Sequence, residues 1–314
     1  MTIFRIYVFT IITLITSKVL GQEEFCECSL HSTLKYKSEY KDFIPNNILT
    51  TNKIKEVVIY AEYQKNTAKD QGLESNTHYI RAKLKFNDQG NLISRIEYSS
   101  GKPSYLYEYK RNQEGLIVQE VYSYLNNNSR KSDFFPGDIK DYYYDNNNLI
   151  KIKRRNYLDE IIPDEKSDYE KFTYNSSDQL TKEISHTYFT ANSSSIYLKE
   201  YELSENNLAT TYTTKFNNEI FGTGKKTYDE KGKLIRETFQ GTGESPSDIV
   251  SIFEYNANNN IIKMQRISKG NYFDECPEDG NFINAYEYDS NGYIKTIIHA
   301  YQDVECKLVF EFRN

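Results

Sequence analysis

The segment YEYDSNGYIKTII, residues 286–298, contains the pattern that decides the fold of this chain. Residues two apart on a strand point to one face, so Tyr286 and Tyr288 are expected to lie side by side on one sheet surface. The turn DSNG supplies an Asp side chain that can accept hydrogen bonds from the backbone ahead of it, and Asn and Gly tolerate a positive φ. The β-branched residues after the turn indicate a returning strand, and the segment therefore predicts a β-hairpin.

The same hairpin pattern recurs along most of the chain, at intervals of about 30 residues. Each copy has an aromatic residue, any residue, a second aromatic residue, Asp or Asn, a polar turn, and then Leu or Ile. One copy has Leu at the second aromatic position, which is occupied in order by Phe86, Tyr109, Tyr144, Tyr174, Leu203, Tyr228, Tyr255, Tyr288 and Phe312. Residues 57–63 and 79–86 are predicted to be strands that lead into these repeats.

One hairpin cannot bury its aromatic face, but hairpins placed edge to edge form a continuous aromatic layer. The repeats therefore predict an all-β chain with one antiparallel sheet of roughly 16 to 20 strands. Because strand twist accumulates, the sheet is expected to curl into a spiral, a partial shell or a collapsed barrel-like body. Among these, we predict a strongly twisted or curled partial shell. The stretches between copies, such as residues 132–140 and 241–248, are rich in turn residues and are predicted to be surface loops.

Three copies, YEYDSNGYI, KTYDEKGKLI and YYYDNNNLI, resemble the YD repeat of RHS-type repeat proteins. They begin at Tyr286, Lys226 and Tyr142, and the resemblance covers residues 84–314. Repeats of that family form large β-sheet shells, some enclosing toxin domains, and others act at cell surfaces, where carbohydrate binding has been suggested. The resemblance implies the hairpin architecture for this chain. A large closed capsule is not expected, because the copies are few.

The first 21 residues are typical of a secretory signal peptide. Arg5 precedes an apolar stretch at residues 6–16, and Val19 and Gly21 put small residues before a cleavage site. A membrane anchor is the alternative, but the apolar stretch is short and Lys18 follows it closely. The mature protein is therefore expected to be secreted, periplasmic or at the cell envelope, without a transmembrane anchor.

Composition narrows the class of protein further. The chain has 314 residues, of which 15% are aromatic and 27% are charged, with a formal charge of −6. Abundant aromatic and β-branched residues argue against a coiled coil and against disorder, and the negative charge argues against a nucleic-acid partner. We divide the chain into the signal peptide at 1–21, an N-terminal cap or loose arm at 22–56, and the repeat domain at 57–314.

The four cysteines, Cys26, Cys28, Cys276 and Cys306, indicate disulfides in an exported chain. Cys276 and Cys306 each lie on a connection into the aromatic strand of neighbouring copies, so we predict a Cys276–Cys306 disulfide. The partners of Cys26 and Cys28 are left open, because a bridge between residues two apart is strained. Metal binding and redox-active thiols are the alternatives to a structural role.

No catalytic residue, resident metal or cofactor is predicted. The motifs HExxH, GxSxG and CxxC are absent, and GTGKKT at 222–227 departs from a phosphate-binding loop and is predicted to be an ordinary loop. One cluster of acids is a candidate for Ca²⁺ binding, although its spacing is not that of an EF-hand, and a solvated loop is the alternative. Its members are Asp159, Glu160, Asp164, Glu165 and Asp168.

The 29 tyrosines are the remaining functional signal, because aromatic faces can stack on sugar rings and on peptides. Sheet packing explains the regular pairs of the repeat. Tyr122, Tyr124 and Tyr272 lie outside the repeat positions and are predicted to form a binding surface.

These observations favour an exported, non-enzymatic repeat protein that presents a β-sheet surface to a glycan or protein partner at the cell envelope. A secreted hydrolase with a carboxylate pair in a gap loop is one alternative. Another is a structural or accessory envelope protein that pairs with a second chain through a free sheet edge, such as residues 308–312.

Overall fold

The computed structural model describes Ile44 and residues 46–63, 79–99, 101–125, 134–156, 167–190, 193–206, 208–242, 248–269, 281–301 and 304–314. These residues form one short helix and strands. The helix is α3 (Asn46–Thr51). The strands are β1 (Glu56–Tyr63), β2 (Tyr79–Phe86), β3 (Leu92–Ser99), β4 (Lys102–Arg111), β5 (Ile117–Leu125), β6 (Phe134–Asp145), β7 (Asn148–Asn156), β8 (Tyr169–Tyr174), β9 (Leu180–Thr190), β10 (Ser193–Leu203), β11 (Ala209–Phe216), β12 (Glu219–Tyr228), β13 (Leu234–Gly241), β14 (Asp248–Tyr255), β15 (Ile261–Lys269), β16 (Phe282–Tyr288), β17 (Ile294–Tyr301) and β18 (Val304–Arg313).

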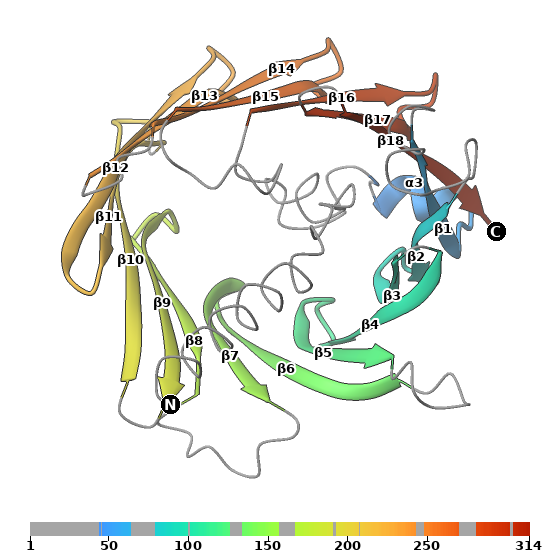
Figure 1. Cartoon of the computed structure of the whole chain (residues 1–314), viewed down its shortest axis with the longest axis horizontal. Helices are drawn as coiled ribbons and strands as arrows, with labels where there is room; N and C mark the ends of the chain where they lie inside the picture. Colours follow the sequence, from blue (N-terminus) through green and yellow to red (C-terminus); the bar gives the residue numbers. More distant parts are fainter. Residues whose placement is uncertain are drawn as a thin grey trace, which may run out of the picture.

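The strands form a single closed antiparallel barrel of 18 strands, in which each strand pairs with its neighbours in the sequence (Figure 1). The ring closes where β1 pairs with β18, with Ile59 opposite Phe310 and Ala61 opposite Leu308. The prediction of a strongly twisted or curled partial shell is therefore wrong. Accumulated twist brings the first and last strands together, and their pairing satisfies two edges that an open sheet would leave exposed. The alternative of association through the edge at residues 308–312 loses its basis, because that strand has partners on both sides.

The hairpin turns have the geometry that the repeat predicts. The side-chain oxygen Oδ1 of Asp289 accepts hydrogen bonds from the backbone nitrogens of Asn291, at 2.8 Å, and Tyr293, at 2.9 Å. Gly292 has a φ of 82°, which a residue with a side chain rarely adopts. Five other turns contain the second of these bonds, in which the side-chain oxygen of the first turn residue accepts a hydrogen bond from the backbone nitrogen four residues later. The accepting residues are Asn87, Asn112, Asn175, Asp229 and Asn256. The local turn chemistry of the prediction is confirmed.

A second repeated contact joins each hairpin to the one before it. In five copies the tyrosine at the second aromatic position donates its hydroxyl to a backbone carbonyl at the start of the preceding strand. The pairs are Tyr144–Ile117, Tyr174–Leu149, Tyr228–Ala209, Tyr255–Leu234 and Tyr288–Ile261, at 2.8 to 3.0 Å. These bonds explain why Tyr rather than Phe is frequent at this position.

Replacing Tyr255 with Phe is expected to lower the free energy of unfolding by about 1 kcal/mol, because the Leu234 carbonyl loses a partly buried donor. Urea denaturation would measure the change. Tyr143→Phe is the matched control, since Tyr143 is 45% exposed and its hydroxyl makes no hydrogen bond among the described residues. Equal stability of the two variants would contradict the role assigned to this contact.

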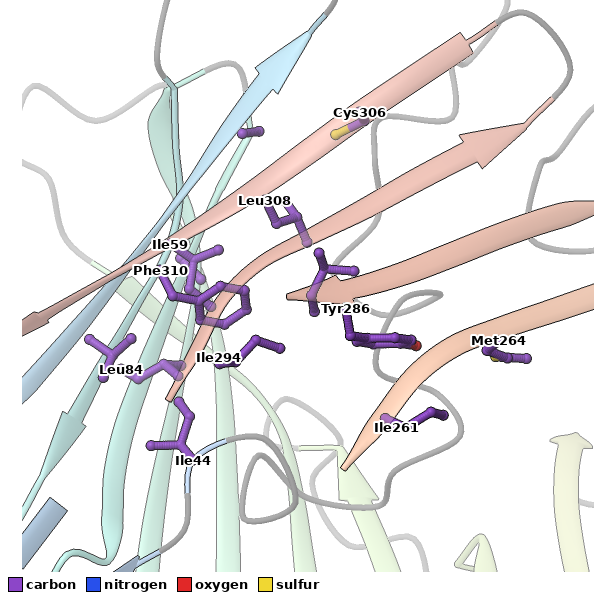
Figure 2. Close-up of a cluster of buried hydrophobic side chains, with 14 of the residues drawn as sticks. Ile44, Ile59, Leu84, Ile261, Met264, Tyr286, Ile294, Cys306, Leu308 and Phe310 are labelled. Carbon is purple, nitrogen blue, oxygen red and sulfur yellow. The ribbon is translucent and has the colours of Figure 1, made fainter. Parts of the chain in front are cut away.

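The inner face of the barrel is identified by α3, which lies inside the ring beside β1, β2 and β18 (Figure 1). Ile44 and Leu49 belong to one buried cluster with residues of β1, β2 and β14–β18 (Figure 2). The cluster contains Tyr286 and Phe253, and Tyr288 and Tyr255 pack against it, so both pairs share a face as predicted. This side of the ring is therefore an apolar inner wall.

The opposite, outer face carries charged side chains that pair between neighbouring strands. Lys215 lies 2.8 Å from Glu200, and Lys263 lies 2.9 Å from Glu254. In the described ranges, no helix has the length and apolar character that crossing a bilayer requires.

Two segments that were predicted to be loops are strands. Most of residues 132–140 belongs to β6, and GTGKKT at 222–227 lies within β12. Their glycines serve side-chain packing. A Cβ on Gly137 would lie 2.7 Å from the Tyr122 ring, and one on Gly224 would lie 2.0 Å from the Tyr212 ring. The glycines let these rings lie flat on the neighbouring backbone.

Cys306 is 1% exposed within the core and is disulfide-bonded. Its partner lies outside the described residues, as do Cys26, Cys28, Cys276 and the predicted signal peptide. The Cys276–Cys306 pairing therefore stays a prediction.

Candidate functional site

The inner wall changes character between β3 and β13, where rings and charges replace the apolar core. On the inner face, buried Leu84 lies opposite Arg95 on the next strand, Arg95 lies opposite Tyr107, and Tyr107 lies opposite Tyr122. Five inner-face rings on β4, β5 and β6 gather here, and we call them the aromatic platform. They are Tyr105, Tyr107, Tyr122, Tyr124 and Phe135.

The rings of the platform form two rows across the strands. In the first row, Tyr105 lies opposite Tyr124, and Tyr124 lies opposite Phe135 and stacks on it with centroids 6.3 Å apart. In the second row, Tyr122 contacts Tyr107 at 5.3 Å, and it also stacks on Tyr105 at 5.6 Å. The first row is open to solvent, since Tyr105, Tyr124 and Phe135 are 40%, 37% and 38% exposed.

A local irregularity in the sheet positions the platform. The pairing of β5 with β6 shifts by one residue between Val121 and Ser123, next to Tyr122. Gly137 lies against the Tyr122 ring at this point, where a Cβ would collide with it. A bulge with a glycine re-aims side chains locally, and here it makes room for Tyr122.

Polar groups border the second row. The guanidinium of Arg95 lies 3.8 Å from the centroid of the Tyr107 ring, and its Nε lies 3.3 Å from a Glu97 carboxylate oxygen. Burial raises the pKa of Tyr107, and the Glu97 charge raises it further, so its hydroxyl stays protonated. The platform therefore combines apolar ring faces with adjacent hydrogen-bond donors and acceptors.

Beyond the platform, charges on successive strands face one another across the inner wall. Lys140 lies 3.2 Å from Glu120, and Arg154 pairs with Asp138. Burial raises the pKa of the Glu170 carboxyl, while Lys140 and Arg154 lower it. Cations on neighbouring strands thus oppose the acids of this wall, which favours a structural ion network over an acid–base pair.

A second group lies on β9–β12 around two lysines, Lys199 and Lys226, which we call the lysine pair. Their ammonium groups lie over the rings of Tyr201 and Tyr212. Tyr201 donates its hydroxyl to Glu183, and Tyr212 stacks on Phe239 with centroids 6.4 Å apart.

The structure unites two of the three tyrosines that the sequence predicted as a binding surface. Tyr122 and Tyr124 belong to the platform, whereas Tyr272 lies outside the described residues. Tyr107 was missed because it occupies a repeat position that packing explains, and Tyr105, two residues before it on the same face, was missed with it. Phe135 was missed because its segment was interpreted as a loop. The sequence signal for the platform was a pair of tyrosines two residues apart on each of two adjacent predicted strands.

Of the calcium candidates, only Asp168 falls in the described part of the chain. Its Oδ1 accepts a hydrogen bond from the Tyr188 backbone nitrogen at 2.7 Å, which is a structural role. Asp159, Glu160, Asp164 and Glu165 lie outside the described residues. Within the described ranges, no group of three or more His, Cys, Asp or Glu residues is arranged to hold a metal ion.

No protein family and no curated protein matches the sequence. Among solved structures, a porin-like protein from Bacteroides uniformis is similar with 8% identity and a TM-score of 0.40, over 83% of this chain and 98% of that chain. A porin-like protein from Bacteroides vulgatus has 8% identity and a TM-score of 0.34 over the same shares of the two chains. The Photorhabdus luminescens Tc holotoxin pore has 10% identity and a TM-score of 0.33, over 72% of this chain and 15% of that chain. Likenesses at this level carry no functional information.

Proposed function

We propose that this protein is an exported, non-enzymatic binding protein of the cell envelope that stacks its aromatic platform on the sugar rings of a glycan. The observation that carries the proposal is the row of Tyr105, Tyr124 and Phe135. Three neighbouring aromatic rings, each more than a third exposed, line the inner wall of the barrel. The predicted signal peptide and the resemblance to YD repeats, some of which act at cell surfaces, support the same proposal.

Rigid rings bind at low entropic cost, because strand pairing already fixes their positions before a ligand arrives. Stacked aromatic contacts contribute about 0.5–1.5 kcal/mol each beyond their buried area, so several rings together give useful affinity. Arg95 and Glu97 lie next to the rings and can contact the hydroxyl groups of a sugar. This combination of a flat apolar face and bordering polar groups suits a carbohydrate better than a purely apolar ligand.

The charge distribution supports an aqueous location within the envelope. The outer face carries ion pairs such as Lys215–Glu200, and the inner face carries pairs such as Lys140–Glu120. A sheet face that contacts lipid hydrocarbon is apolar, and charged side chains there destabilise it. The outer face of this barrel carries ion pairs and does not have that composition, so we propose a secreted or periplasmic protein.

Replacing Tyr105 or Tyr124 with Ala is expected to weaken glycan binding by about tenfold each, because each ring contributes stacking area. A glycan array would identify the ligand, and isothermal titration calorimetry would compare the variants. Tyr143→Ala is the matched control, since that ring is similarly exposed, at 45%, but lies on the outer face.

Equal losses in all three variants, or binding that survives both platform substitutions, would contradict the platform as the site. A pull-down from envelope extract that recovers a protein partner, with no glycan bound on the array, would favour a protein ligand instead. Turnover of glycosidase, peptidase or esterase substrates that disappears on replacing Glu170 with Gln would overturn the non-enzymatic proposal.

A further inference from the structure

The lysine pair brings two positive charges together on the inner wall. The Lys199 Nζ lies 4.0 Å from the centroid of the Tyr212 ring and 5.1 Å from that of Tyr201. The Lys226 Nζ lies 5.2 Å from the Tyr201 centroid and 5.8 Å from the Tyr212 centroid. Both ammonium groups therefore share the same two rings, which form an aromatic floor beneath them.

Neither lysine has an ion pair or a hydrogen bond among the described residues. Glu183 lies opposite Lys199 in the register, but its carboxylate accepts the Tyr201 hydroxyl. Glu237 lies opposite Lys226 without coming within ion-pair distance. The outer face contrasts with this arrangement, because Lys215 and Lys182 of the neighbouring strands both pair with Glu200, at 2.8 and 3.5 Å.

The surroundings of the pair hold these charges in place. Gly224 lets the Tyr212 ring lie against the backbone of β12, and Tyr212 is only 6% exposed. Burial lowers the pKa of Lys199, and the charge of Lys226 lowers it further, while Glu237 and Glu183 raise it. Two like charges on a half-buried wall are costly. Glu237 and Glu183 offset part of that cost, and an anion between the two lysines would offset more of it.

We propose that the lysine pair binds the carboxylate of an acidic sugar, so that the glycan of this protein contains uronic acid residues. The two oxygens of one carboxylate can each accept a charge-assisted hydrogen bond from one ammonium group. The half-buried Tyr201 ring supplies an apolar face for the sugar ring next to that carboxylate, while the buried Tyr212 ring lies beneath the two ammonium groups. The inference rests on the proposed glycan-binding function for the source of the carboxylate.

The test titrates the full mature protein with oligogalacturonate, with the same oligomer after methyl esterification, and with free galacturonic acid. Oligogalacturonate is expected to bind at least tenfold more tightly than its neutral ester, with an affinity that falls as salt rises. Lys199→Met and Lys226→Met are each expected to lower the affinity for oligogalacturonate about tenfold and to leave the affinity for its methyl ester unchanged. Lys225→Met is the matched control, because it changes the adjacent residue on the outer face of β12.

Each outcome separates the two proposals. If the ester and the acid bind equally and the lysine variants match the wild type, the lysine-pair proposal is wrong and the platform proposal stands. If galacturonic acid alone binds in a way that needs both lysines while no oligomer binds, the carboxylate site stands and its glycan source is wrong. If none of the three ligands binds, the lysine-pair proposal is overturned. Circular dichroism of each variant shows whether it folds, and Lys226→Met provides a second test should Lys199→Met fail to fold.

Discussion

Replacing Leu308 with Ala is expected to lower the free energy of unfolding by about 3 kcal/mol, because deleting a fully buried leucine leaves a cavity. Leu308 is 0% exposed and lies at the closure of the barrel, opposite Ala61 on β1 and Ile297 on β17. The lost packing therefore weakens the contact that joins the two ends of the sheet. Urea denaturation of the mature protein, followed by circular dichroism, would measure the change.

Lys307→Ala is the control for this prediction. Lys307 is the preceding residue on the same strand, but its side chain lies on the outer face, is 39% exposed and lies 3.5 Å from Glu62. An exposed ion pair contributes about 0–1 kcal/mol, so this variant should stay close to the wild type. A similar loss in the free energy of unfolding for Leu308→Ala and Lys307→Ala would show that β18 is not anchored through its inner face.

The hairpins could be predicted because their determinants are local. The residues that form one turn, such as Asp289 and Gly292, lie within four positions of one another, and their chemistry specifies the turn without reference to the rest of the chain. The strands at residues 57–63 and 79–86 were predicted for the same reason, from their apolar and β-branched residues.

Closure could not be predicted, because it depends on a contact between opposite ends of the sequence. Ile59 pairs with Phe310, and nothing in either strand marks it as the partner of the other. Twist makes a long sheet curl, but whether the curl brings the terminal strands within hydrogen-bond distance depends on small angles summed over all strands. The local sequence patterns of single hairpins do not determine this total twist.

The platform was predicted only in part, because one pattern can serve packing and binding alike. Tyr107 occupies a repeat position, and its neighbour Tyr105 shares the same inner face. The bulge that frees the rings involves Gly137, in a segment whose Pro and Gly indicated a loop. Glycines that accommodate rings in a strand and glycines that turn a chain cannot be distinguished by residue type.

Because glycine can serve either role, substituting Gly224 tests directly whether its segment is a packed strand or a loop. Gly224→Ala is expected to lower the free energy of unfolding by about 3 kcal/mol, the upper range for overpacking a well-packed site. The added methyl would lie 2.0 Å from Cζ of Tyr212, so the ring must leave a place where it is only 6% exposed. In a surface loop the same substitution would be neutral or stabilising, because alanine restricts the unfolded chain. Thermal and urea denaturation would give the sign and size of the change.

A double-mutant cycle would trace the effect to the ring. Tyr212→Ala removes the atoms that collide with the methyl, so Gly224→Ala should be much less destabilising in the Tyr212→Ala background than in the wild type. Thr223→Ala, on the outer face of the same strand, is expected to change stability by less than about 1 kcal/mol. Since Tyr212 is also part of the floor under Lys199, Gly224→Ala should weaken oligogalacturonate binding even in protein that remains folded. A variant that loses stability but keeps full affinity for the acidic oligomer would separate the packing role of Tyr212 from the lysine pair, and would leave Tyr201 as the ring that supports it.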